Sequence, residues 1–124
     1  MPWTPEQYAA HLAKRSRPTK PDPSGMSESE RELQNEIIQC CRSNNWRIYG
    51  GSMAHRTFRV EGEPDFHIYL PRGKNMLVEC KTRTGKLSTA QLGEKMALEA
   101  LNHTVYIVHS LAEFLEIVAE KLRS

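Results

Sequence analysis

The chain has 124 residues, which is the size of a single domain with a modest hydrophobic core. Its hydrophobic content of 39% and its mixture of both charge signs are typical of a globular protein, and it has no run of about 18 apolar residues that would span a membrane. The net charge of +2 excludes a strongly basic protein, so any contact with nucleic acid must depend on where the charges lie.

Residues 1–27 are predicted to form a basic, proline-rich extension ahead of a domain over residues 28–124. Residues 5–15 could form a short helix, and residues 14–25 combine basic residues with prolines, as linkers do. The extension could contact DNA or be a disordered tail, and the sequence leaves both open. Since the N-terminus has neither an apolar stretch nor a small-residue cleavage site, we expect no signal peptide.

A first long helix is predicted from Ser27 to about residue 44. Leu33, Ile37 and either Cys40 or Cys41 have the spacing of a buried helical stripe.

A strand over residues 46–49 then leads into a loop that ends at Gly62. This loop carries Arg56 and Arg59, which could bind the phosphates of DNA or could simply be solvated.

A β-hairpin is predicted from two strands, over residues 66–70 and 76–81. Proline and glycine within residues 71–75 mark the turn between them. Alternation places the apolar side chains of both strands on one face of the hairpin. It leaves three polar side chains side by side on the opposite face: Asp65, Glu79 and Lys81.

Two helices and a strand complete the chain. Ser88-x-x-Gln91 matches a capping box, so a helix is predicted from there to about residue 101. We expect three of its apolar residues to lie in the core: Met96, Leu98 and Leu101. A buried strand over residues 104–109 and an amphipathic helix over residues 111–122 follow. This order predicts an α/β fold, in which helices cover both faces of a mixed sheet.

The three polar residues of the hairpin have a chemical interpretation. Two adjacent carboxylates repel each other, and Mg²⁺, which prefers carboxylate and water oxygens, is a natural ion to lie between Asp65 and Glu79. Beside such an ion, Lys81 could orient or deprotonate a water that attacks a phosphodiester. The alternative is an ordinary cross-strand salt bridge. These three residues alone favour the two interpretations about equally.

Positive charge along the chain favours contact with DNA. Five basic residues against one acidic residue lie between positions 72 and 86, and we expect them to concentrate near the acidic pair, where a phosphate backbone would lie. They are Arg72, Lys74, Lys81, Arg83 and Lys86. The alternative is that lysine and arginine simply solvate these loops. No aromatic stacking platform that would favour single strands is evident.

The cysteines indicate the compartment. Cys40, Cys41 and Cys80 are odd in number and form no C-x-x-C pair, which argues against a zinc site or a disulfide framework. We therefore expect reduced thiols and a cytoplasmic location, in a bacterium or a host cell.

Pro64-Asp65, thirteen intervening residues and then Glu79-Cys80-Lys81 resemble the PD-(D/E)xK signature of the restriction-endonuclease-like nucleases. The run Gly85-Lys86-Leu87-Ser88, followed by Gln91, is more narrowly similar to the virus-type replication-repair nucleases, the VRR-NUC family. That family also has a Glu-x-x-x-Gln helix ahead of the site, matched here by Glu30 and Gln34. The resemblance covers about residues 28–110 and implies a restriction-endonuclease-like αβββαβ core.

The resemblance also implies roles for individual residues. It makes Asp65, Glu79 and the main-chain carbonyl of Cys80 ligands of Mg²⁺ or Mn²⁺, and Lys81 the residue that activates water. It makes Glu30 a third acidic residue of the site, although Ser27-x-x-Glu30 is also a capping box. It makes Gln91 a residue that faces the site, although capping alone would also explain it.

The expected activity is therefore a metal-dependent DNA endonuclease. Similarity to small stand-alone members of the family implies branched DNA, such as four-way junctions or flaps, and a homodimer, in replication, repair or recombination, as in a phage. The candidate DNA-binding residues are Arg56, Arg59, Arg83 and Lys86. The alternative is a DNA-binding module without catalysis, against which the intact Asp65, Glu79 and Lys81 set argues.

Overall fold

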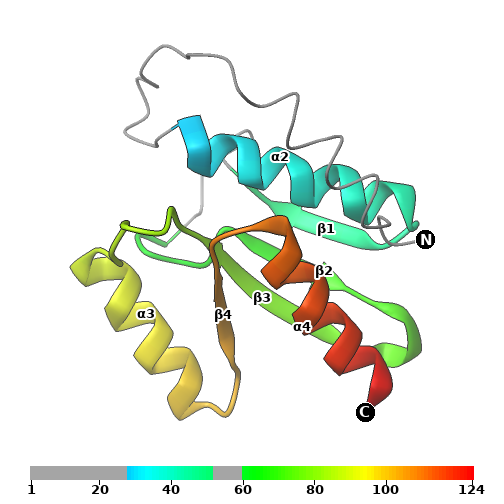
Figure 1. Ribbon diagram of the computed structural model, residues 1–124. Helices are drawn as coiled ribbons and strands as arrows, with labels where there is room; N and C mark the ends of the chain where they lie inside the picture. Colours follow the sequence, from blue (N-terminus) through cyan, green and yellow to red (C-terminus); the bar gives the residue numbers. More distant parts are fainter. Residues whose placement is uncertain (1–27, 52–59) are drawn as a thin grey trace.

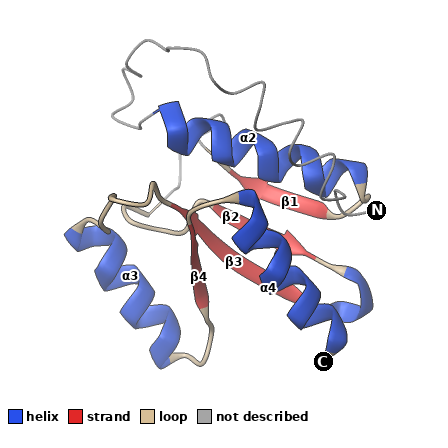
Figure 2. Ribbon diagram, in the orientation of Figure 1, coloured by secondary structure: helices blue, strands red, loops and turns tan. Residues whose placement is uncertain are grey.

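The computed structural model describes residues 28–51 and 60–124, in which helices flank a four-stranded sheet (Figures 1 and 2). The elements in chain order are α2 (Glu28–Ser43), β1 (Arg47–Gly50), β2 (Phe66–Tyr69), the short 3-10 helix η1 (Pro71–Gly73), β3 (Asn75–Cys80), α3 (Thr89–Ala100), β4 (Val105–Val108) and α4 (Leu111–Arg123). The extension over residues 1–27 and two candidate phosphate ligands, Arg56 and Arg59, lie outside the described residues. None of the described helices is long and apolar enough to cross a membrane.

The strands lie in the order β1-β2-β3-β4. β1, β2 and β3 pair antiparallel, and β4 pairs parallel to β3 after the crossover through α3. The predicted mixed sheet and the predicted hairpin are therefore confirmed. In the hairpin, Phe66 pairs with Val78, so Asp65 and Glu79 follow at the same end of the two strands.

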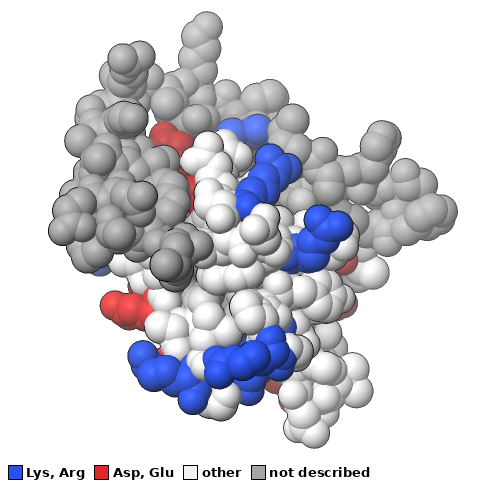
Figure 3. Space-filling view, turned by 90° about the vertical axis from the view of Figure 1, so that its right-hand side faces the viewer, with Lys and Arg blue, Asp and Glu red and all other residues white. Residues whose placement is uncertain are grey.

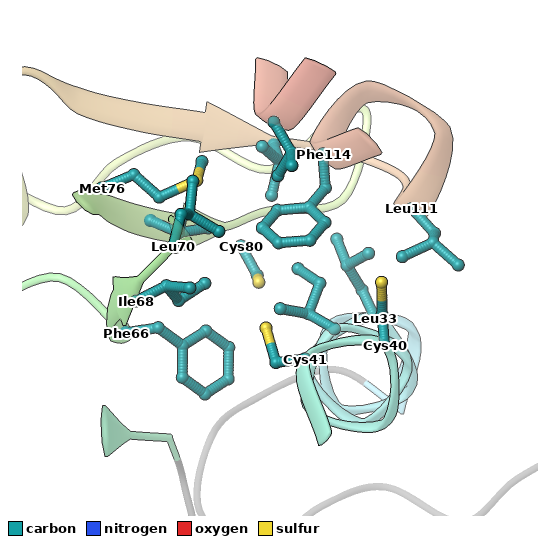
Figure 4. Close-up of a cluster of buried hydrophobic side chains, with 14 residues drawn as sticks. Leu33, Cys40, Cys41, Phe66, Ile68, Leu70, Met76, Cys80, Leu111 and Phe114 are labelled. Carbon is teal, nitrogen blue, oxygen red and sulfur yellow. The ribbon is translucent and has the colours of Figure 1, made fainter. Parts of the chain in front are cut away.

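One face of the sheet packs against α2 and α4 and forms the hydrophobic core (Figure 4). Ile37 of α2 and Phe114 of α4 are fully buried against Ile68 of β2. Cys40 and Cys41 are both buried as free thiols, where the sequence left open which of them would face the core. Burial raises the pKa of the Cys41 thiol to about 12, because the charged thiolate loses its solvation. The thiols therefore pack as small apolar groups.

Among the described residues, the other face of the sheet is only partly covered by a helix, because α3 packs beside β4 and not over β1 and β2 (Figure 1). The expectation that Met96, Leu98 and Leu101 lie in the core is wrong, because no residue of α3 is fully buried and none belongs to the core cluster. Met96 is 63% exposed and Leu101 is 69% exposed, whereas Leu98 is half-buried. A single helix on a small sheet buries only the stripe that touches the strands, so the rest of α3 faces outward.

Local signals at the helix ends are confirmed. The Ser88 hydroxyl accepts a hydrogen bond from the Gln91 main chain at 3.1 Å, and the Gln91 side chain accepts one from the Ser88 main chain at 2.9 Å, which completes the predicted capping box. Asn102 ends the turn after α3 in the left-handed conformation, with φ of 68°.

The basic residues between positions 72 and 86 do not all lie near the acidic pair, so that expectation is wrong for Arg72 and Lys74. Both lie at the hairpin turn, at the end of β3 away from Glu79, and Lys74 Nζ donates to Ser124 Oγ at the C-terminus at 3.4 Å. Figure 3 faces this side of the molecule, and lysine and arginine side chains gather toward its lower edge. Closeness in sequence did not predict closeness in space here, because the turn of a hairpin lies at the opposite end of its strands from the acidic pair.

Candidate active site

Asp65 is the residue just before β2, and the hairpin holds its carboxylate against β3. Its Oδ2 accepts a hydrogen bond from the Cys80 main chain at 2.8 Å, and its side chain is also hydrogen-bonded by Gln34 of α2. On the other side, the Gly51 main chain donates to the Asp65 carbonyl at 2.7 Å. Two hydrogen bonds therefore hold the carboxylate, and a third holds the main chain that carries it.

Glu79 lies beside it on β3, with only 3% of its surface exposed. Gln91 Nε2 donates to Glu79 Oε2 at 2.9 Å, and Lys81 Nζ lies 4.0 Å from the same oxygen. Because alternation turns Cys80 into the core, Glu79 and Lys81 share the opposite face. The structure thus brings together the three residues that the hairpin pattern selected.

The electrostatics of this pair are unusual. Burial, the charge of Asp65 and a hydrogen bond given to Asp65 together raise the pKa of Glu79 to about 8, and the nearby Lys81 only partly opposes them. Burial also raises the pKa of Asp65, against the lowering effect of its hydrogen bonds. Both shifts favour the protonated form, so the pair retains a proton to higher pH than two isolated carboxyl groups would.

Glu30 reaches the same cluster from α2. Burial raises the pKa of its carboxyl first, the charge of Lys81 lowers it, the charge of Asp65 raises it, and a hydrogen bond from the Thr82 main chain lowers it. The charges of Lys81 and Asp65 therefore both act on the Glu30 carboxyl. Its alternative partner, Ser27, lies outside the described residues.

Gln91 combines the two functions that the sequence offered as alternatives. Its Oε1 completes the capping box of α3, while its Nε2 holds Glu79. The first turn of α3 is thereby tied to the acidic pair.

Two glycines let the backbone approach the site closely. Gly50 has φ of +109°, and a Cβ there would collide with the main chain of Asp65. Gly62 has φ of +86°, and a Cβ there would collide with the main chain of Ala90 and crowd that of Gln91. The glycines of this segment therefore position a carboxylate and a glutamine.

Three residues of the site were missing from the set expected from sequence: Gln34, Gly50 and Gly62. For Gln34 the signal was present, because it lies one turn after Glu30 in the Glu-x-x-x-Gln pattern. The glycines had no comparable signal, since a glycine in a loop does not reveal which backbone it must approach.

The two described candidates for DNA binding lie beside the acidic pair along the chain and not within it. Arg83 and Lys86 are exposed on the loop between β3 and α3, close along the chain to Lys81 and Gln91. Within residues 28–51 and 60–124, no three His, Cys, Asp or Glu side chains are grouped closely enough to hold a metal ion. Asp65 and Glu79 nevertheless fit a hard divalent cation, because such an ion would replace the proton that the pair retains.

Comparison with known proteins bears on the fold. A solved structure described as a VRR_NUC domain aligns with 73% of this chain and 95% of its own length, at a TM-score of 0.60 and 21% sequence identity. No family model and no curated protein matches the chain. The protein therefore has the fold of a VRR_NUC domain, and the expected restriction-endonuclease-like architecture is confirmed. The division into an extension and a domain remains a prediction.

Proposed function

We propose that this protein is a metal-dependent DNA endonuclease. The observation that carries the proposal is the meeting of Asp65, Glu79 and Lys81 at one edge of a sheet with the VRR_NUC fold. Buried carboxylates beside an ammonium suit phosphodiester hydrolysis, in which negative charge builds up on a phosphate as water attacks.

Mg²⁺, or Mn²⁺ in its place, is the cofactor that this donor set supports. Asp65 and Glu79 would hold it together with the main-chain carbonyl of Cys80 and water oxygens, and Glu30 would act through water. When bound, the ion makes water a stronger nucleophile and offsets charge on the phosphate.

The protein side chains divide the remaining work. Lys81, whose side chain is 12% exposed, orients the attacking water or stabilises the charge that develops on the phosphate. Gln91 fixes the rotamer of Glu79, and Gln34 and the Cys80 main chain fix that of Asp65. Such support of the primary ligands keeps the geometry ready for reaction.

DNA is the proposed substrate, and branched DNA is the preferred form. Arg83 and Lys86 lie on the exposed loop at the end of the sheet that holds the acidic pair, where they would bind phosphates on either side of the cleaved bond. The preference for junctions or flaps rests on the motif resemblance.

A homodimer is the proposed assembly, and the outward side of α3 is the surface that supports it. Leu92 and Met96 are 49% and 63% exposed there, and a Cβ on Gly93 between them would meet no atom within 4 Å. A mid-helix glycine costs about 1 kcal/mol relative to alanine, and a closely packed second helix would explain it. Two sites related by a twofold axis suit paired nicks in a symmetric junction. Sedimentation should give twice the monomer mass for wild type and the monomer mass for Met96→Glu.

The function is tested by incubating a labelled four-way junction and a matched linear duplex with the wild-type protein, in Mg²⁺ or in EDTA. Cutting of the junction alone, in Mg²⁺ only, supports the full proposal. Cutting of both substrates supports a nuclease without junction preference. Binding without cutting in Mg²⁺ or Mn²⁺ would overturn the endonuclease and favour a DNA-binding module, whose affinity would not depend on the metal.

A further inference from the structure

The open part of the sheet, beside the candidate active site, contains a cavity of about 450 Å³. It lies where α3 and the loop before β2 border the uncovered faces of β1 and β2. Its lining includes a carboxylate of the candidate site, Asp65, together with Tyr49, His67, Leu77, Glu63 and Glu94. A ligand in this cavity would therefore lie against Asp65, one residue of the acidic pair.

Three aromatic rings form a connected surface that begins in this cavity with Tyr49 and His67 and continues beyond it to Tyr69. The rings of His67 and Tyr69 are stacked, with centroids 4.4 Å apart and an interplanar angle of 27°. Tyr49 meets Tyr69 edge to face, with centroids 5.9 Å apart. Tyr49 is 59% exposed and Tyr69 is 45% exposed, so both present ring surface to solvent. The structure thus contains the stacking platform that was not evident in the sequence.

The aromatic platform of Tyr49, His67 and Tyr69 is continuous with the candidate active site. Asp65, His67 and Tyr69 alternate along β2, so they follow one another on the same face at about 6.6–6.8 Å for every two residues. Tyr49 pairs with His67 across the two strands. A chain of nucleotides that leaves the acidic pair along β2 would therefore meet the rings in succession.

The charges of the cavity favour bases over phosphates. Glu63, Glu94 and Asp65 are among the residues that line it, and their negative charge would repel a phosphate backbone. Their carboxylate oxygens can accept hydrogen bonds from base amino groups, as Glu and Asp do with cytosine. Arg47, the cross-strand partner of Tyr69, is exposed at the far end of the platform, where it can bind a phosphate.

We propose that this platform and cavity bind unpaired nucleotides of the DNA substrate, next to the bond to be cut, by stacking the bases on Tyr49 and Tyr69. The proposal rests on the proposed function and adds to it the part of a branched substrate that the protein reads. Every base has a π-face, so stacking would select unpaired structure rather than sequence. An unpaired strand can splay its bases onto the rings, whereas a continuous duplex cannot.

The test uses a flap substrate with 2-aminopurine at the first unpaired nucleotide, and a blunt duplex of the same sequence, both in EDTA. Wild-type protein should quench the 2-aminopurine fluorescence on binding the flap. Tyr49→Ala and Tyr69→Ala should remove the quenching and weaken flap binding on the order of tenfold, with duplex binding unchanged. Tyr49→Phe and Tyr69→Phe are the matched controls, and they should retain both signals because they keep the ring.

Several results would overturn the platform. One is wild-type protein that neither binds the flap nor quenches its fluorescence. Others are alanine variants that quench as wild type does, or that lose flap and duplex binding equally. Conversion of a dimer to monomers by the alanine variants would instead assign the surface to a second copy of the chain. Mg²⁺-dependent cutting of the same flap is measured in parallel. Cutting by wild type and by the alanine variants without any stacking signal would remove the platform and leave the proposed nuclease intact.

Discussion

The sheet residues that face α2 and α4 are apolar or aromatic and mostly buried, whereas those on the opposite face include a buried glutamate, a histidine and two exposed tyrosines. Both faces alternate along the same strands: Ile48 of β1, for example, packs against the core, whereas its neighbour Tyr49 is exposed on the other face. The first face is closed by two helices. The second is closed by one helix that reaches only part of the sheet.

The two faces of the sheet contribute differently: one provides stability, and the other holds the candidate active site. Burial of apolar side chains beneath α2 and α4 provides most of the free energy of folding, since apolar burial contributes roughly 25 cal/mol per Å². The α3 face holds two carboxylates whose raised pKa values indicate an unfavourable environment for charge. Sites that need perturbed groups are expected where the fold can tolerate their cost.

The largest expected effect on stability is therefore on the closed face. Phe114→Ala removes a fully buried ring and should lower the free energy of unfolding by about 3–5 kcal/mol. Met96→Ala, on the outward side of α3, should change it by less than about 0.5 kcal/mol in the monomer. Urea unfolding of both variants measures the contrast. Similar losses for the two variants would contradict the division between the faces.

A smaller effect is expected from the acidic pair, and it depends on pH. The pKa of Glu79 is raised to about 8 in the native protein, from an ordinary value of 4.5, so the native state binds more protons between these values. Wild-type stability in EDTA should therefore fall as pH rises through this window. The glutamine of Glu79→Gln cannot ionise, so this variant should unfold at a higher temperature than wild type near pH 8. The difference should be about 4–8 °C for each kcal/mol of unfolding free energy that wild type loses by ionising Glu79. Near pH 4.5 the two proteins should unfold at similar temperatures.

Thermal unfolding in EDTA at both pH values measures this effect. Glu99→Gln is the control, because Glu99 is exposed on α3 and pairs with Lys95 at 2.7 Å. Its pH profile should follow that of wild type. Parallel profiles for wild type and Glu79→Gln would show that Glu79 is not protonated in the folded protein.

The smallest expected effect distinguishes the two functions of Gln91. Ser88→Ala removes one capping bond and should cost about 1 kcal/mol of stability while DNA cutting persists. Gln91→Ala removes capping and also the contact with Glu79, and it should lower the cutting rate by about tenfold to a hundredfold. Cutting rates at a temperature where both variants are folded make the comparison. Equal rates would leave Gln91 with a capping role alone.

Sequence patterns predicted every described α-helix and strand to within a few residues, because alternation in the hairpin and 3.6-residue spacing in α2 and α4 reflect a closed apolar face. The same patterns also selected Asp65, Glu79 and Lys81, since polar residues on a strand with one buried face must share the other face. Met96 and Leu101 were misassigned because apolar spacing does not reveal how much sheet a helix covers.

Tertiary contacts account for the rest. The aromatic platform joins β1 to β2, and only the register of these strands brings Tyr49 beside His67. Gly50 and Gly62 are explained by the main chains that they approach, which lie far from them in sequence. Arg72 and Lys74 lie close in sequence to Lys81, but the length of the hairpin separates them from it in space.

The most direct test of the central claim compares Lys81→Ala with Lys74→Ala in Mg²⁺, using the DNA that wild type cuts. Lys81 lies 4.0 Å from Glu79, whereas Lys74 lies at the hairpin turn and contacts Ser124. The account predicts that Lys81→Ala cuts about 10²- to 10⁴-fold more slowly while it still binds DNA, and that Lys74→Ala retains its cutting rate. Wild-type cutting by Lys81→Ala would contradict the assignment of the active site.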